Sequence, residues 1–263
     1  MVWLSSCAGI LRAAFEFSGG SPLLFNSSSA RIIAIDPADY EERDSNSPNI
    51  MLLVTRAVPF AVPELEYQSL FISLPVGRWS FALSGQTLGA GQLYQERLGN
   101  IEAVYRYSQR CRLGIGLVGY QVGIRNYGTL SAWAGQLSWA ILLEENISWF
   151  TILENIYCGG MSRLADDLPR VIQTGVRIGS GSLYRGVIRW EQDLQYPGRL
   201  YFDLVARPLH WLGLVVGYYS DPAQILTGIG FTVKGISVEY HTITHPQLGL
   251  SRVFSLGFGS ARR

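Results

Sequence analysis

The chain has 263 residues and a formal net charge of +1 at pH 7, so its overall charge gives no reason to expect binding to nucleic acid. Charged residues make up only 16% of the sequence, and Lys234 is the only lysine. Soluble β-proteins commonly protect their sheet edges with lysine, so this composition argues against an open, soluble sheet. The sequence has no run of about 18 apolar residues, which argues against a transmembrane helix.

The first part of the chain, residues 1–49, differs in composition from the rest. It contains serine-rich and glycine-rich stretches and a charged segment from Asp36 to Asp44, and only Arg31 to Ile35 resembles a strand. We interpret residues 1–49 as an N-terminal extension. The composition leaves two interpretations open, namely a plug inside the domain that follows and a partly ordered leader.

From residue 50 onward, apolar and polar residues alternate with period two. In one segment, Tyr184, Ile188 and Trp190 share one face, whereas Arg185 and Arg189 share the other. Side chains of a strand point alternately to opposite faces, so the pattern predicts a two-faced sheet. A face of arginines opposite a face of aromatic and aliphatic residues is typical of a wall between lipid and a polar lumen.

About fourteen segments are strand candidates on this pattern, although the first two of them alternate poorly. They are residues 50–57, 66–74, 77–87, 100–109, 111–125, 129–143, 147–157, 169–180, 182–193, 199–208, 211–220, 224–233, 235–244 and 249–258. The connections between them alternate between very short ones and longer ones, which include 58–65, 88–99, 158–168 and 194–198. Bacterial outer-membrane barrels have short periplasmic turns and longer outer loops. Residues 50–263 are therefore predicted to form an all-β, antiparallel transmembrane β-barrel of about 14 strands.

One face of these segments carries large apolar residues, with tryptophan and tyrosine near the predicted strand ends. Such residues favour the bilayer interface, because one end of the side chain is apolar and the other forms hydrogen bonds. The candidate lipid-facing and girdle residues are Trp79, Phe81, Trp149, Tyr184, Trp190, Phe202, Trp211, Tyr218 and Tyr240.

The opposite face carries arginines, carboxylates and one histidine, and charged groups at membrane depth need partners or water. The candidate lumen-lining residues are Arg78, Glu102, Arg106, Arg177, Arg185, Arg189, Glu191, Asp203, Arg207, Glu239 and His241. As a structural device these residues pair and rigidify the lumen; as a functional one, the excess of arginine selects anionic solutes. Because opposite charges are interspersed along the strands, we favour the structural interpretation.

Three parts of the chain resemble the PorV/PorQ-type outer-membrane barrels. They are residues 75–83 (PVGRWSFAL), residues 93–96 (LYQE) followed by 103–107 (AVYRY), and the ending at residues 239–258. The resemblance implies a fold similar to the fourteen-stranded long-chain fatty-acid transporter barrels, in the outer membrane of a Gram-negative-type bacterium. It implies one of two roles, a conduit for small or hydrophobic solutes or a membrane component of a larger, secretion-type assembly. Membrane lipid is the expected partner, and protein partners and oligomeric state are left open.

The segment Gly114 to Gly119 matches the G-x-G-x-x-G pattern of dinucleotide-binding loops. Such a loop must follow a strand and open a helix, whereas here the glycines fall inside a predicted strand. We therefore interpret them as small residues on the barrel wall.

Two histidines near the end of the chain raise two further alternatives. His241 and His245 lie about 13 Å apart if they share one face of a strand, which is too far for one metal ion. Glu239 and His241, with Ser237 or Ser255, suggest an outer-membrane hydrolase, but the G-x-S-x-G pattern is absent. We favour a hydrogen-bonded lumen wall, and the sequence thus predicts a non-enzymatic barrel without a cofactor or a metal site.

Overall fold

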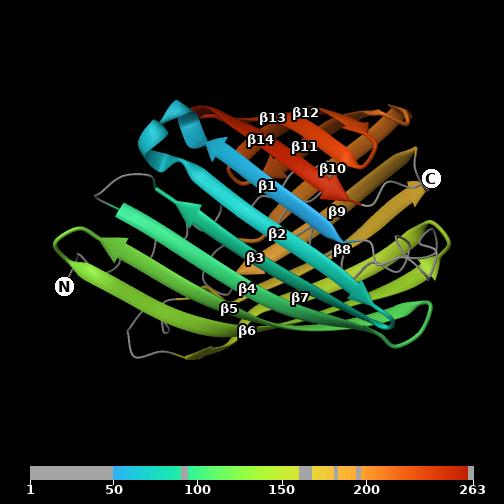
Figure 1. Cartoon of the computed structure of the whole chain (residues 1–263), viewed down its shortest axis with the longest axis horizontal. Helices are drawn as coiled ribbons and strands as arrows, with labels where there is room; N and C mark the ends of the chain where they lie inside the picture. Colours follow the sequence, from blue (N-terminus) through green and yellow to red (C-terminus); the bar gives the residue numbers. More distant parts are fainter. Residues whose placement is uncertain (1–49, 90–93, 160–167, 181–182, 194–196, 260–263) are drawn as a thin grey trace.

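The structure is a computed structural model that describes residues 50–89, 94–159, 168–180, 183–193 and 197–259. The interpretation of residues 1–49 as a plug or a leader lies outside these residues. The described residues form fourteen antiparallel strands and two short 3₁₀ turns (Figure 1). The elements are β1 (Met51–Val58), η1 (Pro59–Ala61), η2 (Pro63–Leu65), β2 (Tyr67–Val76), β3 (Trp79–Leu88), β4 (Tyr94–Arg106), β5 (Cys111–Ile124), β6 (Gly128–Glu144), β7 (Ile147–Gly159), β8 (Val171–Ser180), β9 (Tyr184–Asp193), β10 (Arg199–Leu209), β11 (Leu212–Ser220), β12 (Ala223–Val233), β13 (Ile236–His245) and β14 (Gly249–Gly259).

The sheet closes on itself, because β1 pairs with β14 on one side and with β2 on the other. Each strand pairs with its neighbours in the chain, so the topology is a simple up-and-down barrel. Closure satisfies the backbone groups that an open sheet would leave at its edges. The predicted all-β barrel of about 14 strands is confirmed.

The two ends of the barrel differ in their connections. At one end, the turns are short, as at residues 77–78, 145–146, 210–211 and 234–235. At the other end, which lies on the left in Figure 1, residues 59–66 form the longer connection that contains η1 and η2. We call these the short-turn end and the long-loop end.

One predicted connection is wrong. Residues 88–99 were expected to form a loop, but β4 begins at Tyr94 and pairs with β5 from that residue onward. Glu96 and Arg97 are both charged, so this part of the strand shows no alternation of apolar and polar residues in the sequence. Glu96 is buried on the inner face and Arg97 is exposed on the outer face, so the alternation continues in polar residues.

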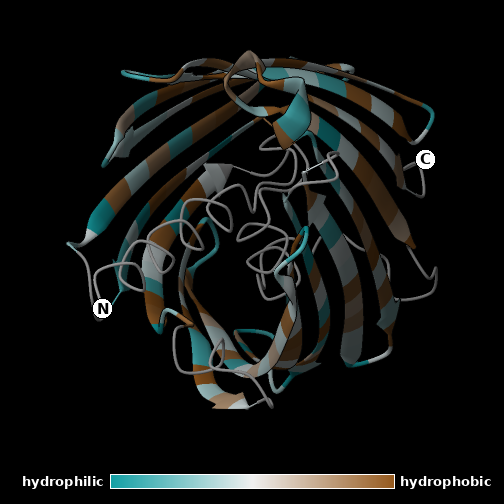
Figure 2. Cartoon of the chain, turned by 90° about the vertical axis from the view of Figure 1, so that its left-hand side faces the viewer, coloured by the Kyte–Doolittle hydropathy of each residue, from teal (hydrophilic) through white to brown (hydrophobic). Residues whose placement is uncertain are grey.

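The exterior of the barrel is apolar, and none of the residues that the structure describes forms a second layer over it. On β3, Trp79, Phe81 and Leu83 are 44%, 46% and 50% exposed, whereas Ser80 and Ala82 between them are buried. Figure 2 shows this alternation of hydrophobic and hydrophilic residues along the strands. Among the described residues, no helix is long and apolar enough to cross a bilayer. A closed barrel with an apolar exterior is the shape that a lipid bilayer requires of a spanning sheet.

The depth of the apolar exterior can be tested with an arginine scan. Leu117 lies on the outer face of β5 and is 51% exposed. We expect Leu117→Arg to lower the free energy of unfolding in lipid vesicles by about 2–4 kcal/mol, because hydrocarbon does not solvate a guanidinium. The matched control is Thr129→Arg at the long-loop end of β6, with an expected loss of about 0–1 kcal/mol. Chemical denaturation followed by tryptophan fluorescence measures both free energies of unfolding. Equal losses in the two variants would contradict an outer surface whose contact with hydrocarbon depends on depth.

Candidate functional site in the barrel interior

The structure places most of the predicted lumen-lining residues on the inner face. Glu102, Arg177, Arg189, Asp203, Glu239 and His241 are buried, and Arg106, Arg185 and Glu191 are half-buried. Arg78 lies elsewhere, exposed in the turn between β2 and β3, because β2 ends at Val76. Arg207 follows the inner positions Asp203 and Val205 of β10 and interacts electrostatically with the buried Glu239, but it is exposed near the short-turn end, where the register shifts.

The predicted lipid-facing residues lie on the outer surface. Trp79, Phe81, Tyr184, Trp190, Phe202, Trp211, Tyr218 and Tyr240 are each between 38% and 48% exposed. Trp149 is half-buried, and its indole N–H donates to the Thr174 hydroxyl at 2.9 Å. Near the short-turn end, Trp79 packs against Tyr105 at a centroid distance of 4.8 Å. Paired aromatic rings of this kind suit the bilayer interface.

A polar region of the inner wall crosses β4, β5 and β6. The Ser138 hydroxyl donates to Glu102 Oε1 at 3.0 Å, and the Gln136 amide donates to Asn100 at 3.3 Å. Both bonds join β4 to β6 and pass over β5, where Gly114 contributes no side chain. A Cβ atom at Gly114 would collide with the Ser138 hydroxyl. Gly114 and Gly116 of the G-x-G-x-x-G segment therefore make room on the inner wall for Ser138 and Gln136.

A second polar region lies where β13, β14 and β1 meet. His241 Nε2 lies 3.1 Å from Glu239 Oε2, and the imidazole lies over Gly228 of β12, which has no Cβ atom to obstruct it. The Ser255 hydroxyl hydrogen-bonds to Thr55 at 3.0 Å. His241 and Ser255 are both 0% exposed, so the structure leaves neither open to a substrate. This packing speaks against the hydrolase alternative and for a hydrogen-bonded wall.

A third region, on β8 to β10, contains Arg189 and Glu191. The Arg189 guanidinium lies 4.2 Å from the centroid of the Tyr201 ring. The Tyr201 hydroxyl donates to Glu191 at 3.2 Å, and Arg189 donates to Gln173 at 3.5 Å. A charged group inside a barrel is stabilised by such neighbours. Arg189 and Glu191 thus share one aromatic partner, Tyr201.

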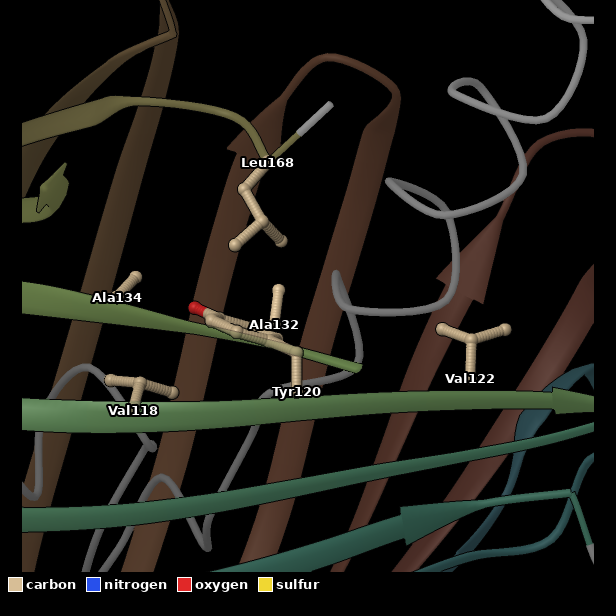
Figure 3. Close-up of a cluster of buried hydrophobic side chains, with 6 residues drawn as sticks. All are labelled: Val118, Tyr120, Val122, Ala132, Ala134 and Leu168. Carbon is tan, nitrogen blue, oxygen red and sulfur yellow. The ribbon is translucent and has the colours of Figure 1, made fainter. Parts of the chain in front are cut away.

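A fourth region is apolar and was missed in the sequence. We call it the Leu168 cluster, and Figure 3 shows its buried members on β5, on β6 and in the connection that leads to β8. They are Val118, Tyr120, Val122, Ala132, Ala134 and Leu168, with Tyr94, Leu98 and Cys158 packed against them. We expected apolar faces to meet lipid and polar faces to line the lumen. On β5, valine and tyrosine alternate with Gly119, Gln121 and Gly123, and there the apolar face is the inner one.

A bulge in β7 holds the Leu168 cluster in place. The register between β6 and β7 shifts beside Asn155, whose φ is 56°. The Tyr120 hydroxyl donates to Asn155 Oδ1 at 2.9 Å, and Asn155 Nδ2 donates to the Pro169 carbonyl at 2.7 Å. Asparagine tolerates this left-handed conformation better than most residues do. Asn155 therefore ties β5 to the residues that precede β8 and fixes the position of Leu168.

Comparisons with known proteins address the fold. No protein-family model matches the chain, and no curated protein matches it in sequence. Among solved structures, a monoaromatic hydrocarbon channel, CymD, has 10% identity and a TM-score of 0.60 over 89% of this chain and 93% of its own. The Ralstonia pickettii toluene transporter TbuX has 9% identity and a TM-score of 0.59 over 94% and 100%. A Pseudomonas aeruginosa FadL homologue has 9% identity and a TM-score of 0.57 over 81% and 90%.

These similarities show the class of fold. The chain shares the β-barrel fold of these solved structures, with an apolar exterior and an interior divided into polar and apolar regions. At such low identity the likeness extends to the fold alone.

The role of Asn155 can be tested by substitution. We expect Asn155→Ala to lower the free energy of unfolding by about 1–3 kcal/mol, because two buried hydrogen bonds are lost. The matched control is Asn126→Ala, since Asn126 also has a positive φ, of 67°, but is exposed in the turn between β5 and β6. Urea denaturation in detergent measures both variants. If the two substitutions lower the free energy of unfolding equally, the backbone conformation of asparagine, rather than its hydrogen bonds to Tyr120 and Pro169, determines the loss of stability.

Proposed function

We propose that the protein is a non-enzymatic barrel of a bacterial outer membrane and conducts small, hydrophobic solutes. The observation that carries the proposal is the Leu168 cluster. It places an apolar surface inside a closed barrel, at the long-loop end, where a polar lumen wall would otherwise be expected. The side chains of the cluster are buried against one another, so they give this part of the interior an apolar lining, and an apolar lining favours apolar occupants.

The solved structures of similar fold support this choice of solute. The names of CymD and TbuX describe a monoaromatic hydrocarbon channel and a toluene transporter. A small aromatic hydrocarbon is therefore the solute to try first. The short turns at one end and the longer connection at the other support an outer-membrane location with the short turns in the periplasm.

The experiment measures toluene uptake by proteoliposomes that contain the folded protein. We expect Leu168→Ser to reduce uptake about 5–30-fold at low toluene concentration, because a lost apolar contact weakens binding by about 1–2 kcal/mol. The matched control is Leu248→Ser, because Leu248 is 53% exposed at the same end of the barrel but is not part of the cluster. Unchanged toluene uptake in Leu168→Ser would show that toluene does not pass by the Leu168 cluster.

A second role is favoured by the packing near β13 and β14, where His241 and Ser255 are fully buried. A packed interior suits a membrane component of a larger, secretion-type assembly, as the PorV/PorQ resemblance of residues 239–258 implies. The same proteoliposomes separate the two roles. A folded wild-type barrel that passes no toluene, and that copurifies with soluble secretion components, would favour the assembly role and overturn the conduit.

A further inference from the structure

The outer face of the barrel carries very few charges. Within the strands of the described residues, the charged residues that point outward are Arg56, Arg97 and Arg252, together with Glu144 at the last position of β6, after a register shift. Each arginine is exposed and alternates with inner-face residues that are buried or half-buried; Arg252, for example, lies between the buried Ser251 and Val253. Glu144 lies at the short-turn end, so the three arginines share their end of the outer face with no carboxylate of those strands.

The three arginines gather at one end. Arg56 lies two residues before the end of β1, and Arg97 and Arg252 are the fourth residues of β4 and β14. Because the strands alternate in direction, all three positions lie toward the long-loop end. Near the short-turn end, outward positions such as Trp79, Phe231 and Ile236 are apolar or aromatic, and Glu144 is the exception on β6.

Polar residues connect the arginines across neighbouring strands. From β1 to β6, each member of one outward row pairs directly with the next. The row is Arg56, Gln68, Thr87, Arg97, Gln121 and Ser131. On the other side of the closure, Thr227 pairs with Thr242, which pairs with Arg252. We call these residues the arginine row, and the next outward positions toward the short-turn end are apolar or glycine, as at Val54 and Leu70.

The arginine row therefore follows the edge of the lipid-facing band, where hydrocarbon gives way to headgroups. Guanidinium groups bind phosphate through two parallel hydrogen bonds, and neighbouring hydroxyl and amide groups add further donors. One acid interacts with the row. Arg56 donates to Glu66 at 2.7 Å and, with Gln68, holds the pKa of that carboxyl below its usual value. Glu66 thus stays ionised and balances Arg56, while Arg97 donates to the neutral side chain of Gln95 at 3.0 Å.

We propose that the arginine row is a binding surface for the phosphate groups of anionic membrane lipids around the long-loop end. The apolar band directly below it supplies the contact for the acyl chains of the same lipids. Continuity with that band favours a lipid as the occupant over a soluble anion, because a soluble anion gains nothing from the apolar surface. The inference does not depend on which solute the barrel conducts.

The test titrates phosphatidylglycerol into the full chain, folded in dodecyl maltoside, and follows the thermal unfolding midpoint. We expect the midpoint of the wild-type protein to rise with phosphatidylglycerol. In the double variant R97Q/R252Q the rise should fall by roughly two thirds, since two of the three outward arginines are lost. The matched control is R78Q/R110Q, which removes two exposed arginines at the short-turn end and should retain the full rise.

Two further arms identify the source of the phosphate and guard against misfolding. Inorganic phosphate at the same concentration should leave the midpoint unchanged, and an equal rise with it would overturn the assignment to lipid. R97K/R252K keeps the charge without the paired donors, and we expect it to recover part of the rise. If R97Q/R252Q folds, as shown by heat-modifiable migration, and responds to phosphatidylglycerol as fully as the wild type, the proposal is wrong. If it does not fold, the wild-type response and R97K/R252K decide the question.

Discussion

The structure depends on the pairing of β1 with β14, which closes the sheet. Once closed, the sheet has no edge to protect, and the backbone groups of neighbouring strands satisfy one another. The outer side chains can then be apolar around the whole circumference, as Phe81, Phe202 and Val238 are, without exposing unpaired polar groups to lipid. The near absence of lysine follows from the same constraint, because neither sheet edges nor a lipid-facing surface needs ammonium groups.

Because the barrel wall is a single sheet, each strand faces outward on one side and into the barrel on the other. The interior is not uniform. The inner face changes around the barrel from hydrogen-bonded polar residues on β4 and β6, to the Leu168 cluster at the long-loop end, to charged residues on β8 to β10. Glycines allow this variety, because the positions of Gly114 and Gly228 give neighbouring side chains room to cross a strand. An interior with both apolar and polar regions suits a solute that is mostly apolar, and its packed region near Ser255 suits a component that supports other proteins.

The fold could be predicted well from the sequence, and the site only in part. The strands around Phe81 and Phe202 were evident because apolar and polar residues alternate there without interruption. The start of β4 was missed because Glu96 and Arg97 break the apolar pattern while the backbone pairing continues. The Leu168 cluster was missed for another reason: period two separates the faces of a strand but does not state which face is outside. On β5 the apolar residues Val118 and Tyr120 face inward.

The sequence by itself determined that the chain forms about fourteen strands, that each strand has two faces, and which end carries the short turns. These features are local, since they rest on the alternation of neighbouring residues and on turn lengths. Only the tertiary structure decided which side chains meet, as when Ser138 reaches Glu102 across a strand or Asn155 joins Tyr120 to Pro169. Such contacts depend on the register of each strand pair and on the closure of the sheet. Strand register and sheet closure relate residues that are far apart in the chain. The alternation of apolar and polar residues along one strand carries no information about them.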